Sequence, residues 1–482
     1  MAKKSSVIIK NLLWKFMERM SSQLVSFIIS LVLARLLMPQ DYGTVAIVNV
    51  LIAICNTIVT SGFGTSLIQK KDTDELDYSS VFYFNMILSI VLYFILFSLS
   101  KWIAGFYGIE DLYIYIRVLG IQIIIYSLNI VQNAYVSKHL MFKYYFFATL
   151  FGNILSGMAG ILMAVLGYGI WALIVQSLMS SIINALVLWN TVKWRPVLKI
   201  SFRRLKELFG FGSKMLMSAF LSSMYEQVTN LVIGRVYSSS DLAYYNRGQN
   251  YPSLLVTNIN SSINTVLFPV ISDVQDDKNE SKMIMRKGIH YSSFILFPAL
   301  IGLAVVAEPL VKILLTDKWL PSVIFIQLFC VYYLICLIQN IRMSTIQATG
   351  DGITYVCVEL FKDIVGIVLL VIMFKHSVEM VAISVLSTTA IISFITCFIV
   401  KNKFNYTFSE QLKDIFIPLS GAGIMGVVVY LISFLEINIY LLFTLQIIVG
   451  ILVYVLYVCC LKDEAYIYLM ERIKDARKKR KH

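Results

Sequence analysis

The sequence is poor in charge for its length. Of its 482 residues only 14% are Asp, Glu, Lys or Arg, whereas 58% are hydrophobic. A water-soluble fold of this size could not cover so much apolar surface. Apolar stretches of about 20 residues, each long enough to cross a bilayer core as a helix, recur along the chain. The sequence therefore predicts an all-α membrane protein that crosses the bilayer many times.

The motifs of common enzymes and pumps are missing as well. There is no G-x-x-x-x-G-K-[ST] sequence, which an ATP-binding loop requires, and no H-E-x-x-H sequence, which zinc hydrolases carry. The four histidines are scattered, and the seven cysteines form no C-x-x-C pair. The triplet Asp72-Thr73-Asp74 resembles the D-x-D of sugar-nucleotide transferases, but it lies in a short loop without a nucleotide-binding domain. We therefore expect no catalytic residue, no metal and no cofactor.

The apolar stretches and the basic residues between them predict the topology. We place about fourteen spans, at residues 14–36, 43–63, 79–100, 112–134, 145–166, 168–190, 209–235, 249–272, 290–315, 322–346, 354–374, 378–400, 415–434 and 438–461. With a cytoplasmic N-terminus, roughly thirty Lys and Arg residues then lie on the inside and about six on the outside. This asymmetry predicts that both termini are cytoplasmic and that the basic tail lies beside anionic lipids. It also explains the net charge of +13 without a nucleic-acid partner.

An arginine and an aspartate at the end of an apolar run occur twice. LVLARLLMPQDYG contains Arg35 and Asp41, and LVIGRVYSSSDLAYYNRGQ contains Arg235 and Asp241, 200 residues later. Each arginine ends a predicted span at the outer surface, and each aspartate precedes the next span, where a carboxylate can cap exposed amides. We favour a structural turn for these residues over an outer gate that contacts substrate.

A second match supports an internal duplication. Gln132-Asn133 in the fourth span corresponds to Gln339-Asn340 in the tenth, at an offset of 207 residues. The two matches predict six helices repeated once, with two helices appended and a central cavity between the repeats. The predicted divisions are an N-terminal lobe with helices 1–6 at 1–191, a basic cytoplasmic linker at 192–208, a C-terminal lobe with helices 7–12 at 209–400, helices 13–14 at 401–461 and a basic cytoplasmic tail at 462–482.

The densest group of charges inside a predicted span lies in VELFKDIVG. Glu359, Lys362 and Asp363 follow the i, i+3, i+4 spacing of one helix face. One interpretation is a trio that neutralises itself. The other is a cavity wall, in which Lys362 meets a phosphate or a carboxylate exchanges a proton or a sodium ion.

Other ionisable residues inside the predicted spans allow two interpretations each. Arg117, Glu226 and Arg342 either pair within the helix bundle or line a cavity. Glu18 and Arg19, near the inner face, either extend to the interface or mark the cavity entrance.

The chain resembles a known family over residues 10 to about 400. Six stretches resemble, in order, the signature stretches of the polysaccharide exporter family: LARLLMPQDYG, SGFGTSLIQKK, VFYFN, IGRVYSSSDLAYYNRGQ, LFPVISDVQDD and FPALIGLAVVAEPLVKILLTDKW. That family includes Wzx-type O-antigen, colanic-acid and teichuronic-acid exporters of the multidrug/oligosaccharidyl-lipid/polysaccharide superfamily. The resemblance implies two six-helix lobes around a central cavity and an alternating-access cycle. It also implies a substrate, an undecaprenyl-pyrophosphate-linked oligosaccharide that moves from the inner to the outer leaflet of a bacterial cytoplasmic membrane.

A pyrophosphate that carries sugars needs cations and hydrogen-bonding amides in the cavity, while its polyprenyl tail stays in lipid. Candidate phosphate ligands are Arg117, Arg342 and Lys362; candidate sugar ligands are Asn129, Gln132, Asn133, Gln339 and Asn340; candidate ion-coupling carboxylates are Glu359, Asp363 and Glu226.

The related lipid II flippases carry several arginines in the first helix. Here that span has Arg19 near the inner face and then no charge until Arg35. We therefore expect spans 4, 10 and 11 to bind the phosphate.

Two other functions stay open. A multidrug or organic-cation antiporter of the same superfamily would need an acidic or aromatic cavity rather than a basic one. A membrane-embedded glycan polymerase or ligase commonly carries a large outer loop, and no predicted outer loop exceeds about a dozen residues.

Overall fold

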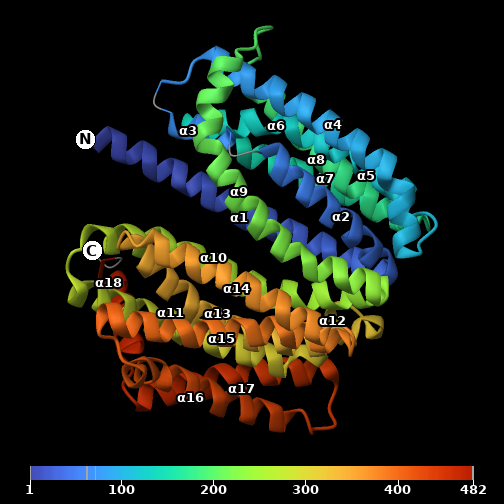
Figure 1. Ribbon diagram of the computed structural model, residues 1–482. Coiled ribbons are helices and arrows are strands. Elements are labelled where there is room, and N and C mark those ends of the chain that lie inside the picture. Colours follow the sequence, from blue (N-terminus) through green and yellow to red (C-terminus); the bar gives the residue numbers. More distant parts are fainter. Residues whose placement is uncertain (1, 61–62, 71, 480–482) are drawn as a thin grey trace. The chain divides into compact units, whose positions relative to one another are not determined.

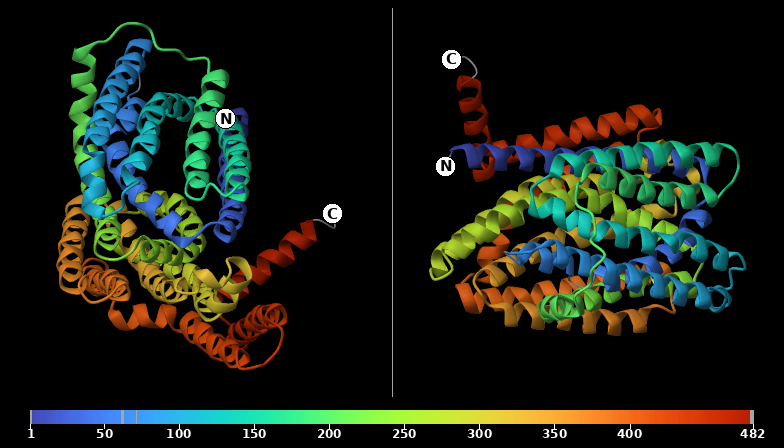
Figure 2. Two further views of the ribbon diagram at one scale, coloured as in Figure 1. Left: turned by 90° about the vertical axis from the view of Figure 1, so that its right-hand side faces the viewer. Right: turned by 90° about the horizontal axis from the view of Figure 1, so that it is seen from above.

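The computed structural model describes residues 2–60, 63–70 and 72–479, and within these ranges every regular element is a helix. The structure does not describe the side chains of residues 2–13, 65, 210–219, 221–222, 225, 258–259, 261–266 and 473–479. The chain forms two compact units, Met1–Ala243 and Tyr244–His482. Figures 1 and 2 show that, within each unit, long helices run alongside one another. The predicted all-α fold is confirmed.

Over its described residues, the first unit contains nine helices and the beginning of a tenth. Their bounds are α1 (Ala2–Leu36), α2 (Pro39–Thr60), α3 (Phe63–Gln69), α4 (Glu75–Tyr107), α5 (Leu112–Leu119), α6 (Ile121–Lys138), α7 (Phe142–Val165), α8 (Trp171–Thr191) and α9 (Phe202–Val236).

The second unit begins within α10 and continues to the C-terminus. Its elements are α10 (Ser239–Asp273), α11 (Lys278–Val305), α12 (Ala307–Leu314), the 3₁₀ helix η1 (Asp317–Trp319), α13 (Ser322–Ala348), α14 (Gly352–Met373), α15 (Val378–Phe404), α16 (Phe408–Ile432), α17 (Ile439–Cys460) and α18 (Glu464–Lys479).

In the described residues, 11 helical segments are long and apolar enough to cross a membrane. The three remaining predicted spans fall almost entirely within α9, α10 and α14, so they are helical too. Every 18-residue stretch of α14 contains the three charged residues Glu359, Lys362 and Asp363, although the rest of this helix is strongly apolar. The protein is a multi-pass membrane protein, and α14 places these charged candidate site residues inside an apolar helix.

Two predicted spans are interrupted. The span at 112–134 divides at Gly120, where an added Cβ would lie 3.2 Å from the ring of Tyr93, so the two helices pack closely at this point. The span at 290–315 ends at Val305, and α12 starts at Ala307. Pro309 lacks an N–H group and its ring would collide with the carbonyl of Val305, which stops the continuous helix.

Side-chain caps define several helix starts. Asp74 and Asp77 form a capping box at α4, and Thr407 and Glu410 form another at α16. A capping box satisfies amide groups that the first helical turn leaves without partners.

The predicted linker is held against α4 in the first unit. The amide of Val197 donates to Ser79 Oγ at 2.9 Å, and that of Ser201 donates to Ser80 Oγ at 2.9 Å. Trp194 is buried between these contacts and α6. Helix α9 then packs on α2 and α4, which places it in the first compact unit. The division into lobes at 192–208 stays a prediction.

Close packing at the start of α2 generates a test. A Cβ added at Gly43 would overlap with the backbone carbonyl of Ser239, at the start of α10. We expect Gly43→Ala to lower the free energy of unfolding by about 1–3 kcal/mol, because a rigid backbone group must move. Thermal unfolding of the purified protein measures this loss.

The matched control is Gly105→Ala, since Gly105 also lies inside a helix but an added Cβ would meet nothing within 4 Å. Because alanine is the better helix former, this control should be neutral or slightly stabilising. Equal stability of the two variants would show that the contact at Gly43 does not constrain the fold.

Candidate functional site

A pocket of about 610 Å³ lies between α10, α13 and α14 in the second unit. Asn340, Ser344 and Gln347 contribute from α13, and Tyr355 and Glu359 contribute from α14. The pocket thus brings together two predicted site residues, Asn340 from span 10 and Glu359 from span 11. Its amide, hydroxyl and carboxyl groups lie beside apolar side chains of α10 and α13, a composition suited to a ligand with many hydroxyl groups.

The turn before α14 fixes the position of this pocket wall. Asp351 accepts hydrogen bonds from the amide of Thr354 at 3.0 Å and from its Oγ at 2.7 Å. The same carboxylate pairs with Lys403 at the end of α15. Because Tyr355 follows one turn later, these contacts orient the helix that carries Tyr355 and Glu359.

The charged trio on α14 contains an ion pair. Glu359 pairs with Lys362 across one helical turn, and both side chains are partly exposed. Asp363 is half-buried next to them. Glu359 therefore faces the pocket while it also neutralises Lys362. This geometry agrees with the interpretation of a self-neutralising trio, and the role of each residue in transport stays a prediction.

Arg342 is buried next to the pocket residue Met343. Its Nη1 donates to the backbone oxygen of Ser393 at 2.9 Å and to Ser393 Oγ at 3.1 Å, so the guanidinium points toward α15. Its Nε is buried without a hydrogen-bond partner among the described residues. No carboxylate pairs with Arg342 in the described part of the chain, and a buried cation without such a partner is costly in a membrane protein. Arg342 therefore stays a candidate for anion binding.

A smaller pocket of about 160 Å³ lies between α1, α6 and α7 in the first unit. Glu18 and Asn133 line it together with Lys15 and Tyr145. The predicted entrance residue Glu18 and the predicted sugar ligand Asn133 therefore meet. Arg19 is half-buried on the same helix.

The two halves of the chain share a pattern at their matching glutamine and asparagine. In each half the asparagine, Asn133 or Asn340, lines a pocket that a glutamate also lines. In each half the glutamine is buried, and the side-chain oxygen of Gln132 or Gln339 has no partner in the described residues. Gln132 Nε2 donates to the backbone oxygen of Trp194 at 3.4 Å. The matching sequence positions thus have matching surroundings.

Several predicted site residues line neither of these two pockets. Arg117 donates from Nε to Ser100 Oγ at 2.9 Å, and its guanidinium lies 4.1 Å from the centre of the Phe97 ring. Glu226 is exposed on α9. Asn129 is buried in α6, and its side-chain oxygen has no partner in the described part of the chain.

The repeated aspartates cap helices. Asp41 accepts a hydrogen bond from the amide of Met38 at 3.1 Å. Asp241 accepts from the amide of Ser238 at 3.1 Å, and Ser238 Oγ accepts from the amide of Asp241 at 3.1 Å. Arg35 and Arg235 are exposed, and Arg235 lies 4.7 Å from the centre of the Phe106 ring.

Sequence reasoning missed three pocket residues, Ser344, Gln347 and Tyr355. Ser344 and Gln347 lie four and seven positions after Asn340, so helical spacing alone places all three on one face. That spacing was the signal that could have identified them. Tyr355 carried no such signal, because its place depends on the turn at Asp351.

The comparisons with known proteins agree with this fold. The sequence pattern of the family described as polysaccharide biosynthesis protein matches residues 32–324. The chain belongs to this family.

The teichuronic acid biosynthesis protein TuaB of Bacillus subtilis is 26% identical over 303 residues, which cover 61% of this chain and 61% of TuaB. The lipopolysaccharide biosynthesis protein WzxC of Escherichia coli is 25% identical over 325 residues, 66% of this chain and 65% of WzxC. The match thus spans less than two thirds of either relative.

Solved structures show the fold of this polysaccharide biosynthesis family member. The lipid II flippase MurJ in an inward closed conformation has a TM-score of 0.77 at 17% identity, over 96% of this chain and 100% of MurJ. An inward-facing multidrug resistance transporter of the MATE family has a TM-score of 0.62 at 14% identity, over 79% of this chain and 94% of that protein.

The Asp351 contacts predict a pH dependence of stability. The hydrogen bonds from Lys403 and Thr354 lower the pKa of Asp351 to about 2. Since the lowered pKa favours the ionised form in the folded state, this contribution is complete above the ordinary aspartate value and is lost as pH falls toward about 2. Asp351→Asn should therefore unfold at a lower temperature near neutral pH and lose less stability than the wild type on acidification.

Thermal unfolding between about pH 6 and pH 3 measures this difference. The control is Asp276→Asn, which removes one exposed carboxylate from the loop before α11. The two variants should differ in their pH profiles. Parallel profiles would show that the Asp351 contacts add no stability.

Proposed function

We propose that this protein is a flippase for undecaprenyl-pyrophosphate-linked oligosaccharides. It carries them from the inner to the outer leaflet of the bacterial cytoplasmic membrane by alternating access. The pocket between α10, α13 and α14 carries the proposal, because amide, hydroxyl and carboxyl groups line it inside a strongly apolar chain. Family membership and relatives named for teichuronic acid and lipopolysaccharide biosynthesis support the substrate class.

The proposed sugar contacts follow from the chemistry of the pocket wall. Asn340 and Gln347 offer both donors and acceptors, and Ser344 adds a hydroxyl group. Tyr355 provides an aromatic face and a polar tip. The polyprenyl chain needs no polar partner and stays in the lipid, while a phosphate requires the cations Arg342 and Lys362.

The proposed orientation places both termini in the cytoplasm. The basic tail at 462–482 then lies at the inner leaflet and attracts anionic lipids. Residues 480–482 of this tail lie outside the described residues. The proposal needs no catalytic residue, metal or cofactor, since translocation changes no covalent bond.

A second candidate function is an organic-cation antiporter. The observation in its favour is that a carboxylate, Glu18 or Glu359, lines each of the two pockets. The pairing of Glu359 with Lys362 weakens this alternative, because the lysine offsets the negative charge that would attract a cation.

The first test is a deletion strain examined for lipid-linked oligosaccharides on the cytoplasmic leaflet. We expect them to accumulate there, and wild-type protein to restore surface glycan. Arg342→Ala and Lys362→Ala should restore at least about tenfold less, because loss of one charge-assisted contact costs roughly 1.5–3 kcal/mol. The amount of protein in the membrane is measured in parallel.

The matched control is Lys375→Ala, which removes a lysine just after the end of α14. It should restore surface glycan fully. Normal surface glycan in the Arg342→Ala and Lys362→Ala variants would exclude both cations from the transport path. A deletion strain that makes normal surface glycan but becomes sensitive to drugs would favour the antiporter.

Ion coupling is tested separately at Glu359. Glu359→Gln keeps the size of the side chain but cannot exchange a proton, so transport in vesicles should lose its dependence on a proton or sodium gradient. Wild-type transport that persists after both gradients are collapsed would remove the coupling role of Glu359. Asp363→Asn, which also keeps the size of its side chain, provides the comparison on the same helix.

A further inference from the structure

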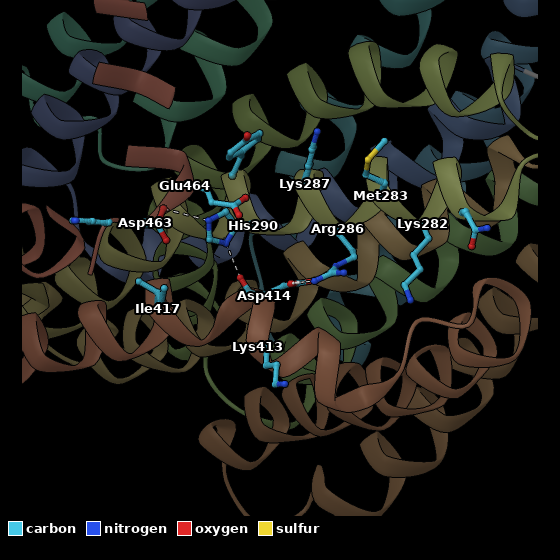
Figure 3. Close-up of a pocket in the computed structure, with 13 residues that line it drawn as sticks. Lys282, Met283, Arg286, Lys287, His290, Lys413, Asp414, Ile417, Asp463 and Glu464 are labelled. Carbon is cyan, nitrogen blue, oxygen red and sulfur yellow. Dashed lines mark hydrogen bonds and ion pairs between the residues drawn. The ribbon is translucent and has the colours of Figure 1, made fainter. Parts of the chain in front are cut away.

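The second unit contains another polar pocket, of about 730 Å³. It lies at the ends of three membrane-spanning helices. Its walls come from the first turns of α11, from the beginning of α16 and from the turn between α17 and α18 (Figure 3). It shares no lining residue with the pocket between α10, α13 and α14.

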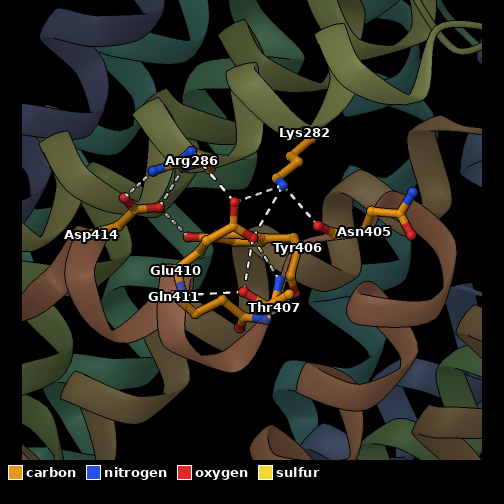
Figure 4. Close-up of polar contacts among 8 residues, drawn as sticks. All are labelled: Lys282, Arg286, Asn405, Tyr406, Thr407, Glu410, Gln411 and Asp414. Atoms are coloured by element: carbon orange, nitrogen blue, oxygen red, sulfur yellow. Dashed lines mark hydrogen bonds and ion pairs between the residues drawn. The ribbon is translucent and has the colours of Figure 1, made fainter.

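The acidic groups of this region are largely engaged by neighbouring cations. Arg286 donates to both carboxylate oxygens of Asp414, each at 2.7 Å (Figure 4). Lys282 pairs with Glu410 at 2.9 Å. His290 lies 3.2 Å from Asp463 and 2.7 Å from the backbone oxygen of Asp414 (Figure 3). These pairs fix the walls of the pocket and leave little negative charge to offset further cations.

Three further lysines line the same pocket. Lys287 belongs to α11, Lys413 belongs to α16, and Lys462 lies in the turn after α17. All three are exposed, and none takes part in an ion pair among the described residues. The remaining acid of the lining, Glu464, offsets at most one of them. The pocket therefore carries excess positive charge supplied by three separate elements.

The backbone at Lys462 has an unusual conformation. Its φ of 51° lies in the left-handed region, where glycine normally ends a helix. The amide of Asp463 donates to the backbone oxygen of Val458 at 3.1 Å, which completes this type of helix end. A lysine at this position costs about 1 kcal/mol relative to glycine. The lysine therefore lowers the stability of the folded protein slightly, and it places a cation beside the pocket.

The surroundings favour a lipid over a soluble anion. Because α11, α16 and α17 are spans, their ends lie at the level of the lipid headgroups. Met283 lines the pocket with 48% of its surface exposed, and Phe416 nearby on α16 is 64% exposed. A basic pocket beside apolar side chains suits a lipid, because the pocket can bind the phosphate while the apolar side chains contact the acyl chains.

We propose that this pocket binds the phosphate-bearing headgroup of an anionic glycerophospholipid and so holds α16 and the α17–α18 turn against α11. Lys287, Lys413 and Lys462 surround the pocket on different sides and attract the headgroup by their charge, and the Arg286–Asp414 and His290–Asp463 pairs position the walls. The proposal does not depend on which substrate the protein transports.

The test uses the full-length protein and native mass spectrometry with added phosphatidylglycerol or phosphatidylcholine. We expect phosphatidylglycerol to bind more tightly and to raise the unfolding temperature. The triple variant Lys287→Gln, Lys413→Gln, Lys462→Gln should bind it about a hundredfold more weakly, since each lysine near an anionic lipid contributes close to a factor of five. Equal binding of the two lipids by the wild type would overturn the proposal.

The matched control is Lys193→Gln, Lys199→Gln, Lys206→Gln, which removes three exposed lysines from the linker and α9 of the first unit. It should bind phosphatidylglycerol as the wild type does. An equal loss of phosphatidylglycerol binding in both triple variants would show that the net charge attracts the lipid without specificity. That result would overturn the proposal that this pocket is the binding site. Inorganic phosphate that stabilises the protein as strongly as the lipid would also overturn it, in favour of a soluble anion.

A single variant separates binding from folding. Lys462→Gly removes the charge but suits the left-handed turn, so the protein without added lipid should be at least as stable as the wild type. Lipid binding should still fall about fivefold. Lys462→Arg should retain it, and unchanged binding by Lys462→Gly would exclude this lysine from the site.

Discussion

The cost of an unsatisfied polar group in the bilayer is the constraint on which this structure depends. It makes every span a helix, because a helix satisfies its own backbone. It also places the ends of the helices under side-chain caps such as Asp74–Asp77 and Thr407–Glu410. Polar side chains that remain inside the spans must then have partners or a ligand, and this is why the few without partners are informative.

The sequence predicted the helices well and the contacts between distant helices poorly. Hydropathy located the spans, and the position of Asp241 at the start of the next span was sufficient to predict a cap. The environment of Arg117 was not predictable in this way. Its side chain contacts Ser100 and Phe97, which belong to another helix, α4. A pattern along the chain contains no information about such a neighbour.

The candidate site shows the same division between local and distant information. Asn340 was predicted from the internal sequence match and Glu359 from the rarity of charge inside apolar runs, and the structure brings the two residues to one pocket. The partner of Arg342 was not predictable, since Ser393 is 51 positions away and binds partly through its backbone oxygen. Tyr355 was missed because the turn at Asp351, rather than helical spacing, determines where α14 begins.

The ion pair between Glu359 and Lys362 links two residues of α14 for which different roles are proposed. They lie one helical turn apart, so a substitution of either residue changes the surroundings of the other. The proposed contact of Lys362 with a phosphate and the proposed ion exchange at Glu359 are therefore not independent. A loss of transport in one variant has to be interpreted together with the result for the other variant.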